Sequence, residues 1–349
     1  MAEAEKWLFN ARRAEVSPSV SLSYISTFEE GQSSRNPASD GKKTILLVHG
    51  YPQTLYSMRH VYQLLADAGL NVVAADYRGA GGSSMPVGGY DKWTMGEDLH
   101  KLMTEHLGAQ RYSVLGHDIG SMIATAMALR YREAVQALIV MECPQPGTFA
   151  YKDSITNLDF TYGSCFHFFF HNARDLPEQL TYGREDIYLD HFFDRLALHP
   201  HFLTDKERTV YHNAFKKSGR MRAGFEVYRA FTQDDEDVRK SVKEQGKIEV
   251  PVLATGGEKS KLTEVSVCNN AGSRSAPSVI DHAAGPPNPA APDHPTGSTR
   301  ICFGRELRRH PKCVSLGARG ECRGTGQGGV GISPMIAVPL AVCNPGTCE

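Results

Sequence analysis

Residues 116–120 read Gly-His-Asp-Ile-Gly, and this stretch determines the expected fold more clearly than any other part of the chain. It follows the apolar run 112–115 and precedes a run with helical character at 121–130. Glycines on both sides of one polar residue, between a buried strand and a helix, are typical of a strained turn that exposes a nucleophile. The pattern therefore predicts that Asp118 is a nucleophile, although aspartate also serves well as the N-cap of a helix.

The choice of aspartate at the nucleophile position restricts the chemistry. A carboxylate that attacks a saturated carbon forms an ester, which water can cleave, whereas serine would leave a stable ether. An aspartate nucleophile therefore indicates a substrate with an electrophilic sp3 carbon, such as an epoxide or an alkyl halide.

The composition excludes several classes of protein. The 349 residues are 41% hydrophobic and carry a formal net charge of −1, so no nucleic-acid partner is expected. The amino terminus lacks the pattern of a signal peptide, and no apolar run approaches the roughly 20 residues of a membrane span. We therefore expect a cytoplasmic protein with no membrane partner. None of the eight cysteines forms a C-x-x-C pair, and we expect no metal site and no cofactor.

Apolar runs alternate with helical stretches over the first half of the chain. Strands are predicted at 20–28, 44–48, 71–75, 112–115, 137–141 and 248–254, and helices at 56–68, 93–107, 121–130, 166–170, 188–198, 207–215 and 222–231. This order predicts an α/β fold with a doubly wound, mostly parallel sheet and an inserted helical lid. The predicted parts are a core at 1–147, a helical cap at 148–246, a core strand continuation at 247–260 and an atypical tail at 261–349.

The composition changes abruptly after Ser260. Residues 261–349 contain one aromatic residue, 10 of the 19 prolines and 12 of the 33 glycines. Such a segment buries too little apolar surface to offset the entropy of ordering. We predict that it is largely disordered and that it is not the native ending of this fold.

Three motifs resemble those of one enzyme family. His-Gly-Tyr-Pro at 49–52 and Asp-Tyr-Arg-Gly-Ala-Gly-Gly-Ser at 76–83 precede the Gly-His-Asp-Ile-Gly turn. Together they are similar to the signature motifs of epoxide hydrolases and their dehalogenase relatives in the α/β-hydrolase superfamily. The resemblance covers roughly residues 10–260. It implies that a small-molecule epoxide is opened to a diol through a covalent ester on Asp118, with the backbone N–H groups of Tyr51 and Ile119 as the oxyanion hole. His49 is expected to be structural.

The acid that orients the general base departs from the family pattern. Epoxide hydrolases often carry an aspartate where this chain has Ser260. Glu142, at the end of the strand that precedes the lid, resembles the acid position of several dehalogenases in the superfamily. Glu142 is therefore the predicted acid, and Glu258 is the alternative.

The lid of the family supplies proton donors. Tyr228 resembles one of the two lid tyrosines that protonate the epoxide oxygen. The position that matches the other tyrosine is Phe166, which carries no donor. His167 beside it is similar to a histidine that helps to hold the halide in fluoroacetate dehalogenases, so His167 and Phe166 are predicted substrate-binding residues.

The motif that carries the general base in this family is missing from the chain. The family places this histidine in a G-H-[WF] motif after the last strand, and no such motif follows Ser260. His282 is the nearest candidate by position, and His294 is the second. The alternatives to an epoxide hydrolase are a dehalogenase that cleaves a carbon–halogen bond and a hydrolase-fold protein whose catalysis is impaired by the missing base.

Overall fold

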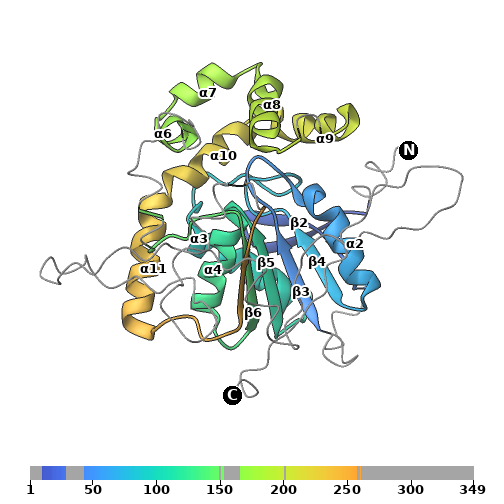
Figure 1. Ribbon diagram of the computed structural model, residues 1–349, viewed down its shortest axis with the longest axis vertical. Helices are drawn as coiled ribbons and strands as arrows, with labels where there is room; N and C mark the ends of the chain where they lie inside the picture. The colour runs from blue at the N-terminus through green and yellow to red at the C-terminus, as the bar shows by residue number, and fades with distance from the viewer. Residues whose placement is uncertain are drawn as a thin grey trace, which may run out of the picture. The chain divides into compact units, whose positions relative to one another are not determined.

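The computed structural model describes residues 10–28, 43–148, 151–152, 166–199, 202–257 and 260. Figure 1 shows a sheet covered by helices, with a group of further helices at one end of the strands. The predicted tail at 261–349, together with His282 and His294, lies outside the described residues, as does Glu258.

The strands of the described residues form one sheet in the order β1-β2-β4-β3-β5-β6-β7. The strands are β1 (Arg12–Ser17), β2 (Val20–Ser26), β3 (Thr44–Val48), β4 (Asn71–Ala75), β5 (Tyr112–His117), β6 (Val135–Met141) and β7 (Val252–Thr255). β1 and β2 pair antiparallel to their neighbours, and the strands from β4 to β7 run parallel. The predicted doubly wound, mostly parallel sheet is therefore confirmed.

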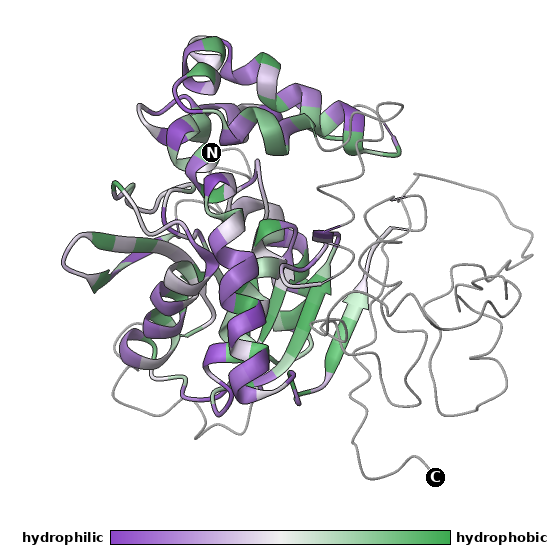
Figure 2. Cartoon of the chain, turned by 90° about the vertical axis from the view of Figure 1, so that its left-hand side faces the viewer, coloured by the Kyte–Doolittle hydropathy of each residue, from purple (hydrophilic) through white to green (hydrophobic). Residues whose placement is uncertain are grey.

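The central strands are apolar on both faces because helices cover both faces. In β3, Ile45 and Leu47 belong to the apolar cluster that includes α2 (Arg59–Asp67), which follows a 3-10 helix at Leu55–Met58. Leu46 and Val48 belong to the cluster on the opposite face. Figure 2 shows the contrast between the hydrophobic central strands and the helices, in which hydrophilic and hydrophobic residues are mixed.

The second face is covered by α3 (Lys92–Lys101), a π-helix at Leu102–His106, and α4 (Ile119–Arg130). α11 (Phe231–Gln245) packs against α3 and α4, as Figure 1 shows. α11 falls within the range predicted for the cap, but it lies along the core.

The helices α6 to α10 form a group that we call the cap. They are α6 (Phe166–Asn172), α7 (Leu176–Thr181), α8 (Glu185–Leu196), α9 (Asp205–Phe215) and α10 (Arg220–Arg229). The cap lies at the ends of the strands that carry the predicted catalytic motifs (Figure 1). None of the helices in the described ranges is long and apolar enough to cross a membrane.

Candidate active site

Asp118 occupies the turn between β5 and α4 with a backbone conformation that side chains rarely adopt. Its φ is 52° and its ψ is −122°. This conformation costs roughly 1–3 kcal/mol and is maintained only where the surroundings enforce it. Asp118 occupies the N-cap position of α4, but its side chain makes no capping hydrogen bond to the helix beyond Ile119, so helix capping does not account for this carboxylate.

Close packing around the turn enforces that conformation. A Cβ atom on Gly120 would lie 2.2 Å from the carbonyl oxygen of Val48, so only glycine allows α4 to approach β3 this closely. The buried Ser121 hydroxyl donates to the Gly116 carbonyl oxygen at 2.7 Å and accepts from the Met141 N–H at 2.9 Å. These contacts tie the turn to both neighbouring parallel strands.

Two backbone N–H groups are directed at the Asp118 carboxylate. The N–H of Tyr51, in the loop after β3, donates to Asp118 Oδ1 at 2.8 Å. The N–H of Ile119 also donates to the Asp118 side chain. Both donors would remain near the carbonyl oxygen if the carboxylate became an ester, and this is the position that an oxyanion hole requires.

The surroundings of Asp118 act on its pKa in opposite directions. Desolvation raises the pKa of the carboxyl above its ordinary value, while the neighbouring His117 and the two N–H donors lower it. Burial also lowers the pKa of His117, while the carboxylates of Asp118 and Glu142 raise it. Both shifts follow from placing ionisable groups where water is largely excluded.

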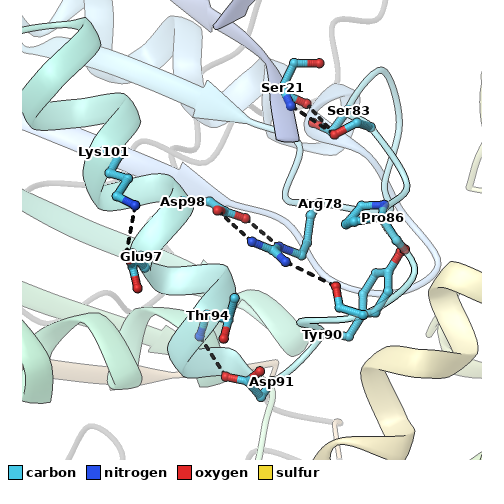
Figure 3. Close-up of polar contacts among 12 residues, drawn as sticks. Ser21, Arg78, Ser83, Pro86, Tyr90, Asp91, Thr94, Glu97, Asp98 and Lys101 are labelled. Carbon is cyan, nitrogen blue, oxygen red and sulfur yellow. Dashed lines mark hydrogen bonds and ion pairs between the residues drawn. The ribbon is translucent and has the colours of Figure 1, made fainter. Parts of the chain in front are cut away.

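The motif at 76–83 holds the neighbouring loops in place. Asp76 Oδ1 accepts from the Leu55 N–H at 2.7 Å, and Asp76 Oδ2 accepts from the Gly82 N–H at 2.8 Å. Arg78 donates from Nε and Nη2 to the two carboxylate oxygens of Asp98 at 2.6 and 2.7 Å, a bidentate pair that Figure 3 shows. The motif thus anchors its loop to α3.

His49, the first residue of the 49–52 motif, is also enclosed. Its Nε2 lies 3.3 Å from Asp76 Oδ1, and its ring stacks on Tyr77 with centroids 4.4 Å apart. The side chain has no solvent exposure. Its surroundings fit the structural role expected from the sequence.

Glu142 follows the last residue of β6 and lies close to the turn that carries Asp118. Its φ is 56°, another rare conformation for a residue with a side chain. Glu142 Oε2 accepts from the Ser260 hydroxyl, and Oε1 accepts from the Gly257 N–H. The structure therefore brings together the two positions, Glu142 and Ser260, that the sequence analysis considered for the acid. One of them holds a carboxylate and the other a hydroxyl that donates to it, whereas two carboxylates would repel each other.

Tyr228 is buried in α10, and its ring packs against Tyr51 of the core with centroids 5.3 Å apart. Desolvation raises the pKa of the phenol well above its ordinary value, and the negative charge of Asp118 raises it further. Tyr228 is therefore protonated at neutral pH and is able to donate its proton.

The two α6 residues that are predicted to bind substrate differ in burial. His167 is buried, and its ring packs edge-on against Tyr228 with centroids 5.4 Å apart. Phe166 is 38% exposed, and its ring contacts His191 at a centroid distance of 5.5 Å. His167 is thus close to the predicted proton donor, whereas Phe166 lies toward the outside of the cap.

Sequence reasoning missed two polar groups in this region. His171 has no solvent exposure, and its Nε2 lies 2.6 Å from the Tyr188 hydroxyl oxygen. The centroids of the His171 and Tyr228 rings are 4.4 Å apart. Burial lowers the pKa of His171 well below its ordinary value, so it is neutral. The second group is the hydroxyl of Tyr51. His171 follows His167 by one helical turn, and this spacing is the signal that could have revealed it.

Comparisons with known proteins bear on the fold and the family. The family model described as "alpha/beta hydrolase fold" matches residues 43–274. The chain is 31% identical over 216 residues to the soluble epoxide hydrolase of Corynebacterium sp. (strain C12), covering 61% of this chain and 73% of that protein. It is 41% identical over 103 residues to the fluoroacetate dehalogenase of Burkholderia sp., covering 28% of this chain and 33% of that protein.

Among solved structures, the crystal structure of wild-type Cfl2 from Burkholderia cenocepacia is similar, with a TM-score of 0.62 and 32% sequence identity. The match covers 70% of this chain and 78% of that one.

Proposed function

The chain belongs to the α/β-hydrolase family, and on that premise we propose that it opens an epoxide to a diol through a covalent ester on Asp118. The observation that carries the proposal is the combination at one site of three features. Asp118 sits on a strained turn, two backbone N–H groups donate to its carboxylate, and the protonated phenol of Tyr228 lies nearby.

In the first step the Asp118 carboxylate attacks one carbon of the epoxide ring. A carbon–oxygen bond of the ring breaks, and its electron pair remains on the oxygen. Tyr228 transfers its proton to that oxygen, which a phenol with a raised pKa can do because it is still protonated at neutral pH. His167 packs against the Tyr228 ring and belongs to the same site.

In the second step a histidine removes a proton from water, and the hydroxide attacks the carbonyl carbon of the ester. The N–H groups of Tyr51 and Ile119 stabilise the oxyanion, an effect of about 3–4 kcal/mol per donor in other enzymes. The ester bond breaks, and the leaving alkoxide takes the proton that remained on the attacking hydroxide, so that the diol leaves and Asp118 is again a carboxylate. The proton held by the histidine restores the Tyr228 phenol. The sum of both steps is the addition of one water to one epoxide.

Glu142 orients and stabilises the protonated histidine in this scheme, as a buried carboxylate does in a catalytic triad. Its fixed position is supported by the hydrogen bonds from Gly257 and Ser260. Where the unmodified chain hydrolyses the ester at a measurable rate, changing Glu142 to Gln should slow ester hydrolysis more than ester formation. If Glu142→Gln hydrolyses the ester at the unmodified rate and Glu258→Gln hydrolyses it much more slowly, the acid is Glu258 and not Glu142.

The identity of the base is tested separately. The sequence has no G-H-[WF] motif after Ser260, and alkylation of Asp118 does not require a base. We therefore expect this chain to accumulate the ester, because loss of one member of such a group usually costs several orders of magnitude in rate. Steady turnover would overturn this expectation, and loss of that turnover in His282→Ala would identify His282 as the base.

Two positions favour an epoxide over a halogenated acid. A haloacid dehalogenase clamps the substrate carboxylate with arginines just after the nucleophile. In this chain the corresponding positions are Ile119 and Met122, each 1% exposed, and neither can bind a carboxylate. The experiment is to incubate the chain with styrene oxide and, separately, with fluoroacetate, using Asp118→Asn as the control. Asp118-dependent consumption of the epoxide supports the proposal, whereas release of fluoride with no reaction of the epoxide would make the protein a dehalogenase.

A further inference from the structure

The Tyr51 side chain carries a polar group whose presence the packing does not explain. Tyr51 is 8% exposed, and its hydroxyl has no hydrogen-bond partner among the residues that the structure describes. A buried polar group without a partner costs about 1–3 kcal/mol. Phenylalanine would make the same ring contacts without that cost, so the hydroxyl requires another explanation.

The position of Tyr51 is fixed at both of its ends. Its backbone N–H is bound to Asp118 Oδ1 at 2.8 Å. Its ring fills the space beside Gly224 in α10, where a Cβ atom would lie 2.8 Å from Tyr51 Cε2. The side chain therefore extends from the nucleophile toward the cap.

This placement puts the Tyr51 ring beside that of Tyr228. Tyr228 follows Gly224 by four residues and so lies on the same face of α10. The two rings meet edge to face, with centroids 5.3 Å apart. In a displacement at carbon, the leaving oxygen departs on the side opposite the attacking carboxylate. For an attacked carbon that lies between Asp118 and the cap, that side faces Tyr51 and Tyr228.

We propose that the Tyr51 hydroxyl is a second hydrogen-bond donor to the epoxide oxygen, acting beside Tyr228. This inference rests on the proposed epoxide opening. Tyr228 transfers its proton to the oxygen as the carbon–oxygen bond breaks, whereas Tyr51 donates a hydrogen bond and keeps its proton. Tyr51 thus serves both steps, with its hydroxyl in ring opening and its N–H in ester hydrolysis. It supplies the donor that Phe166 lacks.

The test is the substitution Tyr51→Phe, which removes the hydroxyl and retains the backbone N–H and the ring. Two quantities are measured: the urea concentration at half-unfolding, and the rate at which styrene oxide adds to Asp118 in a single turnover, followed by peptide mass spectrometry. Tyr211→Phe is the matched control, because Tyr211 is a buried cap tyrosine that packs against Tyr56 outside the site.

We expect Tyr51→Phe to be at least as stable as the unmodified chain and to alkylate about 10- to 100-fold more slowly. Tyr211→Phe should alkylate at the unmodified rate. A Tyr51→Phe variant that alkylates at the unmodified rate overturns the inference and leaves the proposed function intact. A variant that loses stability overturns it too, because the hydroxyl would then have a structural partner. If the unmodified chain forms no ester with the epoxide, the proposed function and this inference both fail.

Discussion

The buried ion pair between Lys92 and Asp234 allows a quantitative test of how α11 is held against α3. Lys92 is the first residue of α3, and Asp234 lies in the first turn of α11. Both residues are 2% exposed. Lys92 Nζ donates to Asp234 Oδ2 at 2.5 Å and to the Val227 carbonyl oxygen at 2.8 Å, and it lies 4.7 Å from the centre of the Phe231 ring.

Replacing Lys92 with Met removes the cation and leaves the carboxylate buried. Breaking a buried pair by removing one partner costs about 3–5 kcal/mol, whereas an exposed pair is worth about 1 kcal/mol or less. Burial already raises the pKa of Asp234 even with Lys92 present. Without Lys92 the carboxyl should bind a proton more tightly still in the folded state than in the unfolded chain. The loss of stability should therefore be largest at neutral pH and should shrink as the pH falls toward the ordinary pKa of aspartate.

The assay is urea unfolding of the full chain at pH 7 and pH 5, followed by far-UV circular dichroism. We expect Lys92→Met to lose about 3–5 kcal/mol at pH 7, and the double variant Lys92→Met/Asp234→Asn to recover roughly half of that loss because no charge remains buried. The reasoning would be refuted by a loss below about 1 kcal/mol at pH 7, which is the value of an exposed pair. A loss that grows as the pH falls would refute it as well.

Three further outcomes follow from the site. Desolvation raises the pKa of Asp118, so the folded state binds this proton more tightly than the unfolded chain does. The Asp118→Asn variant should therefore melt at a higher temperature than the unmodified chain at pH 7, and the difference should narrow toward pH 4. This variant should form no ester. Ser260→Ala removes the hydroxyl that donates to Glu142 and should cost about 1–2 kcal/mol in urea unfolding, a loss that Ser260→Thr should largely avoid. Gly120→Ala places a methyl group 2.2 Å from the Val48 carbonyl oxygen and should cost about 3 kcal/mol or abolish alkylation, so wild-type stability and alkylation would contradict the described turn.

The buried strands could be predicted from the sequence because parallel strands under two layers of helices read as continuous apolar runs. The predicted ranges 44–48 and 71–75 coincide with β3 and β4. The strand predicted at 248–254 corresponds to β7 but starts later, at Val252. Pro251 directly precedes β7, and proline has no N–H for the ladder. β1 was not predicted.

Two helices were missed for reasons of composition and length. α11 is largely polar, and only a few of its residues are buried, among them Phe231 and Val238, so the apolar stripe is too narrow to be recognised. α7 has six residues, too few for a helical period to show.

The candidate site was predictable where it depends on local motifs. The turn at Asp118 and the Tyr51 N–H follow from short patterns next to buried strands. The positions of the cap side chains depend on how each helix is rotated, and the sequence of α6 is aromatic on every side. That rotation places His167 and His171 inside and Phe166 at the edge, and it could not be deduced from the residue types alone.

The central claim is that Asp118 becomes covalently attached to the substrate. The most direct measurement is peptide mass spectrometry of the segment that contains Asp118 after a single turnover with styrene oxide in heavy-oxygen water. The account predicts that this peptide carries either the mass of one epoxide molecule, if the ester persists, or one heavy oxygen, if the ester has been hydrolysed. Heavy oxygen found only in the diol, with an unmodified Asp118 peptide, would mean that water attacks the epoxide directly and would contradict the account.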